Sequence, residues 1–291
     1  MKLIDTIGME GTLYEPGKRT EGVWLRQGLG LMMDSKNIAQ EDWRKYNEPY
    51  RANDWQVILV LEGSYTSRYN LLDVERTKGQ LIIQRPGLLI THTKASSDVN
   101  LRTLSINPEL LGNITMQDYY LLFRLTEEQR KCVLSYFDLM EQQVKNYNLD
   151  VRILSDLGSS LLRYALQIGQ ESFGKKEKQS QETVSRNTLI FREFISLLNT
   201  HGTKEHKIAF YADQLAMTPN YLNSLIKQVS GQTIMSWINE YLIAEIKATL
   251  SHSDMSVENI SDALYFPNSA FFCKFFKKHT GLTPSQYRKS K

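Results

Sequence analysis

Residues 266–288, FPNSAFFCKFFKKHTGLTPSQYR, carry the pattern that decides the fold of the C-terminal part of this chain. Phe272, Phe275 and Phe276 are spaced at i, i+3 and i+4, so they share one face of a helix, and that face must be buried. The opposite face is small and cationic, and it consists of Ala270, Lys274 and Lys277. A helix with an apolar back and cationic edges fits a groove that is lined with phosphates.

The same pattern occurs once before, about 50 residues upstream, in residues 217–237, MTPNYLNSLIKQVSGQTIMSW. The matched pairs are Leu222 with Phe272, Ile226 with Phe276, Lys227 with Lys277, Gly231 with Gly281, Thr233 with Thr283, and Trp237 with Tyr287. Before the turn the offset is one residue smaller, because Leu215 matches Leu264 and Met217 matches Phe266. A duplication that repeats an outward lysine arises by chance far less easily than one amphipathic helix.

The ends of the helices are marked in both copies. Thr218 is the expected N-cap residue of the upstream helix, with Pro219 in its first turn. Gly281 suits the left-handed residue that ends the downstream helix, and Thr283 with Pro284 starts a short helix after it. The other helices expected in this region cover residues 189–198, 219–228 and 234–250.

Residues 186–291 resemble the DNA-binding domain of the AraC/XylS family of bacterial transcription regulators, which is a pair of helix-turn-helix units joined by a helix. The residues that carry the resemblance are Ile260, Leu264, Phe266, Phe272, Phe276, Lys277, Gly281, Thr283, Pro284, Tyr287 and Arg288. The chain departs from the family pattern at three places. Tyr265 replaces the usual glycine of the second turn, Ala270 replaces a frequent polar residue, and Leu242 replaces the usual arginine of the linking helix.

Composition bounds the class of protein without identifying it. The chain has 291 residues, of which 41% are hydrophobic and 23% charged, as in a globular protein with room for two domains. The formal net charge is only +3, and from Asn187 onward eleven Lys or Arg oppose eight Asp or Glu. Cys132 and Cys273 form no C-x-x-C pair, and no signal peptide or apolar run of membrane-spanning length occurs, so we expect a cytoplasmic protein.

Residues 1–112 predict β structure. Short apolar runs at 56–61, 81–83 and 88–93 are separated by glycine and proline turns, which indicates a barrel or jelly roll. The order of these turns resembles the cupin-like sensor half of many AraC-type regulators.

Residues 115–171 change to a helical period. One apolar stripe consists of Leu125, Val133, Phe137, Met140 and Val144, and a second of Val151, Leu154, Leu157, Leu161, Leu162, Tyr164 and Ala165. The family resemblance implies that such a helical pair forms a dimer. The alternative is that both helices cover the open face of the barrel, and apolar stripes alone do not separate the two.

Residues 172–186 are polar and charged, which is typical of a linker between domains. We therefore expect an α+β chain of two domains. Its N-terminal domain, 1–171, is a cupin-like β-barrel or jelly roll (1–112) with a helical pair (115–171). Its C-terminal domain, 187–291, is an all-α tandem helix-turn-helix.

The outward faces of the two copied helices supply the candidate DNA contacts. The upstream candidates are Thr218, Asn220, Tyr221, Asn223, Ser224 and Lys227. The downstream candidates are Asn268, Ser269, Ala270, Cys273, Lys274, Lys277 and Lys278. Asn220 and Asn223 are the best base readers, because asparagine pairs with adenine through two hydrogen bonds. Ala270 and Cys273 offer at most apolar contact to thymine, so we expect the upstream helix to carry more of the specificity.

The sequence gives no catalytic constellation. His92 is the only histidine before residue 200, which excludes a three-histidine metal site in the barrel, and no phosphate-binding or dinucleotide-binding glycine loop occurs. We expect no enzyme activity, no metal and no cofactor. If the barrel binds a small molecule, Trp24, Trp43 and Trp55 are candidates to stack on it.

Three function classes follow. The first is a transcription regulator, an activator by family resemblance, that responds to a small-molecule effector, forms a homodimer and engages RNA polymerase on double-stranded DNA. The second is a DNA-binding regulator whose barrel only dimerises or binds a protein partner. The third is a cupin-type enzyme with a DNA-binding tail.

Overall fold

The structure is a computed structural model that describes residues 23–26, 29–32, 49–111, 114–116, 118–145, 151–180 and 186–290. The chain divides into two compact units, Met1–Gln179 and Ser180–Lys291, and each is described by itself. Within the described residues, no helix is both long and apolar enough to cross a membrane.

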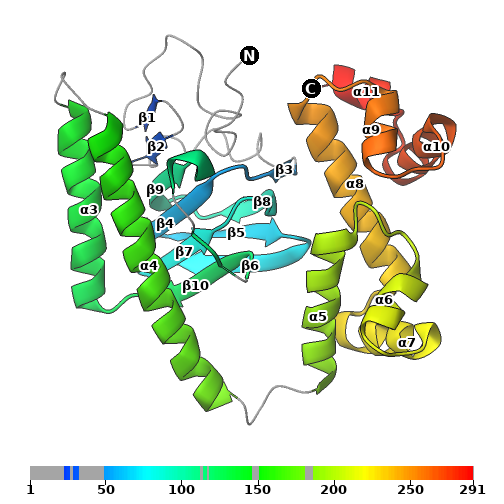
Figure 1. The fold of residues 1–291 in the computed structure, drawn as a ribbon, viewed down its shortest axis with the longest axis horizontal. Coiled ribbons are helices and arrows are strands. Elements are labelled where there is room, and N and C mark those ends of the chain that lie inside the picture. The colour runs from blue at the N-terminus through cyan, green and yellow to red at the C-terminus, as the bar shows by residue number, and fades with distance from the viewer. Residues whose placement is uncertain are drawn as a thin grey trace. The chain divides into compact units, whose positions relative to one another are not determined.

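The first unit contains two antiparallel sheets (Figure 1). The six-stranded sheet has the order β1 (Val23–Arg26), β2 (Leu29–Met32), β9 (Asn100–Ile106), β4 (Trp55–Glu62), β7 (Gln80–Gln84) and β10 (Tyr120–Arg124). The four-stranded sheet has the order β3 (Tyr50–Arg51), β8 (Leu89–Ala95), β5 (Ser64–Tyr69) and β6 (Leu72–Thr77). The β structure predicted for residues 1–112 is therefore confirmed for those of them that the structure describes.

The two sheets share one apolar core, and each supplies alternate residues to it. Ile58, Ile82 and Leu101 of the six-stranded sheet lie in the same buried cluster as Tyr65 and Ile90 of the four-stranded sheet. Successive side chains of a strand point to opposite faces, so the remaining residues of β4, β7 and β9 face away from this core.

Two long helices cover the other face of the six-stranded sheet, as Figure 1 shows: α3 (Glu127–Lys145) and α4 (Val151–Ser180). Val57 and Leu104 of the sheet lie in one buried cluster with Phe137 of α3 and Leu161 of α4. The helix α4 approaches the sheet closely at Gly169, where an added Cβ would lie 2.7 Å from a ring carbon of Phe123. Most residues of the apolar stripes predicted for residues 115–171 are thus packed on the sheet. This is the arrangement expected if both helices cover the open face of the β structure.

The predicted linker, 172–186, is helical over residues 172–180, because α4 continues to Ser180. Lysine, glutamate and glutamine favour helix even without an apolar stripe, which explains why the polar composition did not end α4. The next helix begins at Arg186, one residue before the expected start of the domain at 187. Residues 181–185 lie outside the described part of the chain.

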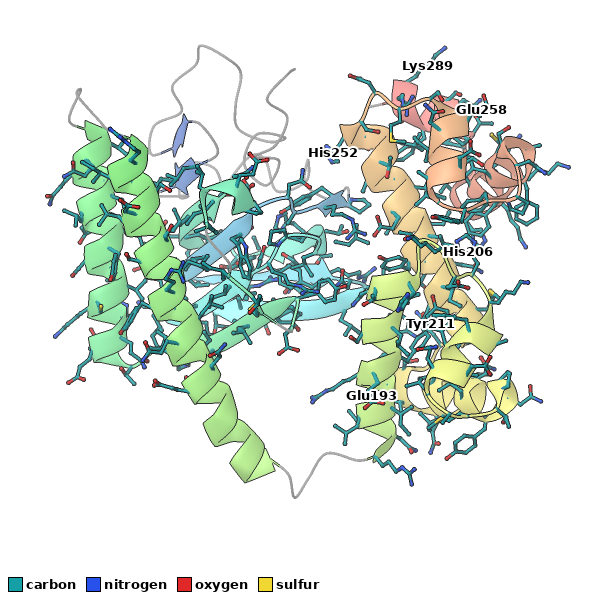
Figure 2. All side chains as sticks on the ribbon, in the orientation of Figure 1. Glu193, His206, Tyr211, His252, Glu258 and Lys289 are labelled. Atoms are coloured by element: carbon teal, nitrogen blue, oxygen red, sulfur yellow. The ribbon has the colours of Figure 1, made fainter. Side chains whose placement is uncertain are left out.

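The second unit is all helical. Its helices are α5 (Arg186–His201), α6 (Ile208–Gln214), α7 (Pro219–Ser230), α8 (Ile234–His252), α9 (Val257–Ala263), α10 (Ser269–Thr280) and α11 (Pro284–Lys289). In Figure 1 the long helix α8 runs from the pair α6 and α7 at one end to the pair α9 and α10 at the other, and α7 and α10 lie on the same side of it. Tyr211 extends from α6 toward α5, where its ring packs on Phe194 with the ring centroids 5.5 Å apart (Figure 2).

The turn between α6 and α7 and the turn between α9 and α10 contain equivalent backbone hydrogen bonds. The backbone N–H of Met217 donates to the carbonyl of Ala212 at 2.9 Å, and that of Phe266 donates to the carbonyl of Ser261 at 3.0 Å. The extra residue of the second copy, Pro267, follows this bond and precedes α10. The insertion therefore lies in the turn and disturbs neither helix.

The residue before each of these bonds has left-handed backbone. Ala216 has φ 52° and Tyr265 has φ 54°, so the second turn keeps the geometry that glycine usually provides. Tyr265 remains 58% exposed, which lets its ring stay clear of the core. Both residues pay a conformational cost that glycine avoids.

We expect Ala216→Gly to raise the free energy of unfolding by about 0.5–1 kcal/mol, because glycine adopts this backbone without strain. The matched opposite change is Gly231→Ala, at φ 78°, where an added Cβ meets nothing within 4 Å. It should lower the free energy of unfolding by about 1 kcal/mol through backbone strain alone. Urea unfolding of the full chain measures both, and a stability loss in Ala216→Gly would contradict the assignment of strain.

Candidate nucleic-acid interface

The helix α7 begins where the sequence predicts, and it ends at Ser230, two residues beyond the expected end at 228. Thr218 is the N-cap residue, and its hydroxyl accepts a hydrogen bond from the backbone N–H of Tyr221 at 3.3 Å. Pro219 occupies the first turn, and Gly231 ends the helix in the left-handed region. The apolar face, Leu222, Leu225 and Ile226, is buried. The opposite face of α7 is thereby fixed toward solvent.

That outward face carries most of the upstream candidates. Asn220, Ser224 and Lys227 are exposed, and Tyr221 is 58% exposed. The hydroxyl of Ser224 donates to the carbonyl of Asn220 at 3.0 Å, so it offers only its oxygen lone pairs to a ligand. Asn220 presents an amide of the kind that pairs with adenine.

Asn223 has a structural role that the sequence pattern did not reveal. Its side-chain oxygen accepts a hydrogen bond from the backbone N–H of Ile234, the first residue of α8, at 3.1 Å. The residue is half-buried, and its bond satisfies one of the N–H groups that every helix start leaves without a partner inside the helix. A two-bond pair with adenine needs this oxygen as well as the amide nitrogen, so Asn223 is a poorer base reader than predicted.

The second copy needs no such bond. The position equivalent to Ile234 is Pro284, which has no N–H to satisfy, and the position equivalent to Asn223 is Cys273. The difference between asparagine and cysteine at these two positions thus follows from the residue that begins the next helix.

The helix α10 presents a more cationic face. Asn268 is its N-cap residue, and its side-chain oxygen accepts from the backbone N–H of Phe271 at 2.8 Å, so this oxygen is also engaged. Ser269 and Cys273 are half-buried. The exposed downstream candidates are Asn268, Ala270, Lys274, Lys277 and Lys278. Within the described part of the chain, none of the three lysines forms an ion pair, which leaves their ammonium groups available to phosphate.

The sequence reasoning missed Phe271. Its side chain is 54% exposed on α10, at the position equivalent to the exposed Tyr221 on α7. An exposed phenylalanine that recurs as an aromatic residue in both copies is a contact candidate, because a ring can pack on a thymine methyl or a sugar. The offset of 50 residues between the copies was the signal that could have identified it.

Trp55, a candidate for stacking on a ligand, packs on the helix side of the six-stranded sheet. The residue is 6% exposed and lies in the cluster between the six-stranded sheet and the helices α3 and α4, not in the core between the two sheets. The reason is strand parity, since Gln56 and Ile58 are the residues of β4 whose side chains share the inner face. The side chain of Trp24 and all of Trp43 lie outside what the structure describes.

The first unit also offers no metal centre where the structure describes it. No group of three or more His, Cys, Asp or Glu residues could hold a metal ion there. His92, the histidine nearest to such a role, is bound on both ring nitrogens: the Tyr50 hydroxyl lies 3.0 Å from Nε2 and the Ser67 hydroxyl 2.7 Å from Nδ1.

Comparison with known proteins agrees with this geometry. A family model described as a helix-turn-helix domain matches residues 211–290. An uncharacterized HTH-type transcriptional regulator of Bacillus subtilis, YtdP, is 36% identical over 102 residues, which are 35% of this chain and 13% of that protein. The arabinose operon regulatory protein of Salmonella typhimurium is 29% identical over 98 residues, 33% of this chain and 35% of that protein. A solved structure of ToxT from Vibrio cholerae covers 84% of this chain and 92% of its own, at 13% identity and a TM-score of 0.37.

The C-terminal unit is therefore a helix-turn-helix domain of the kind found in transcription regulators. The similarity to the arabinose and melibiose operon regulatory proteins agrees with the resemblance to the AraC/XylS family that the duplicated pattern indicates. The alignments span only 13% and 35% of the two curated relatives. What the whole chain binds and regulates is consequently a matter for proposal.

Substitutions of the two asparagines of α7 should have different effects on base preference and on stability. Asn220→Ala should relax base preference at one position of a bound duplex by about 1–3 kcal/mol and leave stability unchanged, because Asn220 is exposed. Asn223→Ala should instead lower the free energy of unfolding by about 1 kcal/mol, because the N–H of Ile234 loses its acceptor. Binding to a library of duplex variants and urea unfolding measure the two effects. A change of base preference in Asn223→Ala without loss of stability would contradict the assignment.

Proposed function

We propose that this chain is a sequence-specific transcription regulator that reads double-stranded DNA with α7 and α10. One observation carries the proposal: the two helices are copies of one pattern, and each keeps an exposed lysine, Lys227 and Lys277, at the same place on its outward face. Both helices lie on the same side of α8 (Figure 1), which suits one side of a duplex.

The length of α8 supports simultaneous binding. Its 19 residues span about 28 Å at about 1.5 Å per residue. Successive major-groove segments on one side of DNA are about 34 Å apart. Two helices packed near the ends of α8 are thus suitably spaced to enter neighbouring segments of the major groove.

The residues divide into base readers and phosphate binders. Asn220 is assigned to an adenine, with Tyr221 and Ser224 beside it, so the upstream unit carries more of the specificity. Ala270 and Phe271 of α10 provide apolar contact to thymine methyl groups. Lys227, Lys277 and Lys278 are assigned to phosphates, which fix position on DNA without reading sequence.

The N-terminal unit is assigned the role of a cupin-like sensor that binds a small-molecule effector. The double sheet supports this assignment, because its core contains buried polar groups, described below, which a purely structural core has no need of. By resemblance to the family, we extend the proposal to an activator that forms a homodimer and engages RNA polymerase.

The alternative is an N-terminal unit that only dimerises, and one observation supports the dimer that both candidates share. Leu139 of α3 and Ile153 of α4 are 42% and 49% exposed although both helices already bury an apolar stripe on the sheet. Exposed apolar residues on neighbouring helices are typical of a surface that packs on a second copy. Sedimentation of Leu139→Glu and Ile153→Glu variants distinguishes monomer from dimer.

The test of DNA binding is selection of duplexes from a random pool by the full chain, followed by titration of the selected duplex at several salt concentrations. Lys227→Ala and Lys277→Ala should each reduce the slope of log affinity against log salt by about 0.9 and weaken all sequences alike. The matched control is Lys94→Ala, which removes an exposed lysine of β8 in the other unit and should change neither. The proposal fails if no sequence is enriched, or if the slope is the same in all four proteins.

A further inference from the structure

A buried arginine in the N-terminal unit has no hydrogen-bond partner among the residues that the structure describes. Arg76 of β6 has no exposed surface, and its three guanidinium nitrogens form no hydrogen bond with any residue that the structure describes. Two aromatic rings pack on the guanidinium instead, because its central carbon lies 4.4 Å from the ring centroid of Tyr65 and 4.1 Å from that of Tyr69. All three side chains lie in the space between the two sheets, on the inner face of the four-stranded sheet.

This arrangement is costly for a structural core. A guanidinium keeps its charge at any pH that a folded protein meets, and it carries five N–H donors. Aromatic faces attract the charge, but they do not replace the acceptor oxygens that water supplied to the donors. An apolar side chain of similar volume would fill the same space without this cost. The arginine is therefore explained by a partner that brings acceptor oxygens of its own.

The chain's own carboxylates do not fill that role in the described residues. Asp54, which is 2% exposed, accepts a hydrogen bond from the Ser105 hydroxyl at 2.9 Å, and it forms no ion pair with Arg76. Nor does the neighbouring His92 compete for an anion. Burial, and then the charge of Arg76, lower the pKa of His92 to about 3, so its ring is neutral at pH 7. The guanidinium of Arg76 is therefore a buried positive charge that has no anionic partner among the described residues.

Further hydrogen-bonding groups lie across the gap on the six-stranded sheet. Gln84 is 1% exposed; its amide nitrogen donates to the Tyr69 hydroxyl, while its oxygen has no partner among the described residues. The strand register places Gln84 beside Gln56, and Gln56 beside Ser105, in one cross-strand row. The wall beyond them is mainly apolar: it includes Ile58 and Ile82, with Thr103 beside Ile58. Polar groups at one end and apolar residues beyond them suit a ligand with one polar end.

We propose that Arg76 binds the carboxylate of a small organic acid between the two sheets, and that this acid is the effector of the regulator. The inference rests on the proposed sensor role of the N-terminal unit and names the chemical class of its ligand. A planar carboxylate accepts two parallel N–H bonds from a guanidinium, and a single cation suits a monoanion better than a phosphate dianion. The apolar wall accommodates a hydrocarbon or aromatic body.

Binding of the acid also changes the packing of side chains on the four-stranded sheet. Because Arg76 has no exposed surface, an acid reaches it only if the ring of Tyr65 or Tyr69 swings aside. Both rings project from β5, and β5 is the only neighbour of the edge strand β6 in the four-stranded sheet. The acid therefore acts on the packing of the β5–β6 edge, which gives the unit two states for a regulator to use.

Thermal unfolding of the full chain tests the proposal with benzoate and hexanoate, each compared with its neutral amide at the same millimolar concentration. We expect both acids, and neither amide, to raise the melting temperature of the wild type. Arg76→Met should raise the melting temperature of the protein without ligand, because a desolvated charge is removed, and should abolish the acid-dependent shift. Arg76→Lys, which keeps the charge and loses the planar fork, should weaken acid binding by about 10-fold or more.

The matched control is Arg68→Gln. Arg68 belongs to β5, is exposed, and pairs with Asp73 at 3.0 Å, so its loss should leave the acid-dependent shift unchanged. The proposal is overturned if no acid shifts the wild type, if amides match acids, or if Arg76→Met lowers the melting temperature without ligand. The last result would assign Arg76 to a carboxylate of this chain. Binding of the selected DNA duplex by the same variants is measured in parallel, so a failure of DNA recognition is distinguished from a failure of acid binding.

Discussion

The second unit depends on a hydroxyl group that brackets the end of each copied helix. The Ser230 hydroxyl donates to the carbonyl of Ile226 at 2.8 Å and accepts from the backbone N–H of Gln232 at 3.3 Å. Thr280 makes the same two bonds, to Phe276 at 2.8 Å and from Leu282 at 3.3 Å. In both copies the chain then turns through a left-handed glycine into the next helix. These bonds end α7 and α10 in the same way, and the buried apolar side chains of each helix fix which face points outward.

The first unit depends on a different constraint, the parity of strands that are buried on both faces. In β4, Val57 and Leu59 pack toward the helices, while Ile58 and Val60 pack toward the other sheet. The buried polar residues of the six-stranded sheet include Gln56, Gln84 and Ser105, which are neighbours at one end of the inner face. The buried arginine and its two tyrosines come from the facing sheet, so the polar end of the core is assembled from both sheets.

Much of this structure was predictable because its signals are local. Helix caps such as Thr218 and Gly231, and the one-residue difference between the copies, depend on residues close in sequence, and the structure confirms them. Two features depend on a partner outside the same helix or on strand parity. Asn223 pairs with a residue eleven positions later, and the inward or outward direction of Trp55 depends on the parity of its strand.

Other features were missed for different reasons. The helical continuation over 172–180 was hidden because polar composition predicts solvent exposure and says little about backbone conformation. In the sequence, Arg76 is one of several charged residues in a short strand. In the structure its neighbours Glu75 and Thr77 are not buried. Only the packing of two sheets shows that its side chain is enclosed.

The bond between Asn223 and Ile234 has a consequence for substitutions at the equivalent positions of the two helix-turn-helix copies. In the upstream helix-turn-helix copy, Asn223 of α7 also secures the start of the next helix, so a substitution at this position is tied to a loss of structural support. In the downstream helix-turn-helix copy, Pro284 has no N–H group to satisfy, so position 273 carries no such structural role. A substitution at position 273 is therefore less tightly linked to the stability of the next helix than a substitution at position 223.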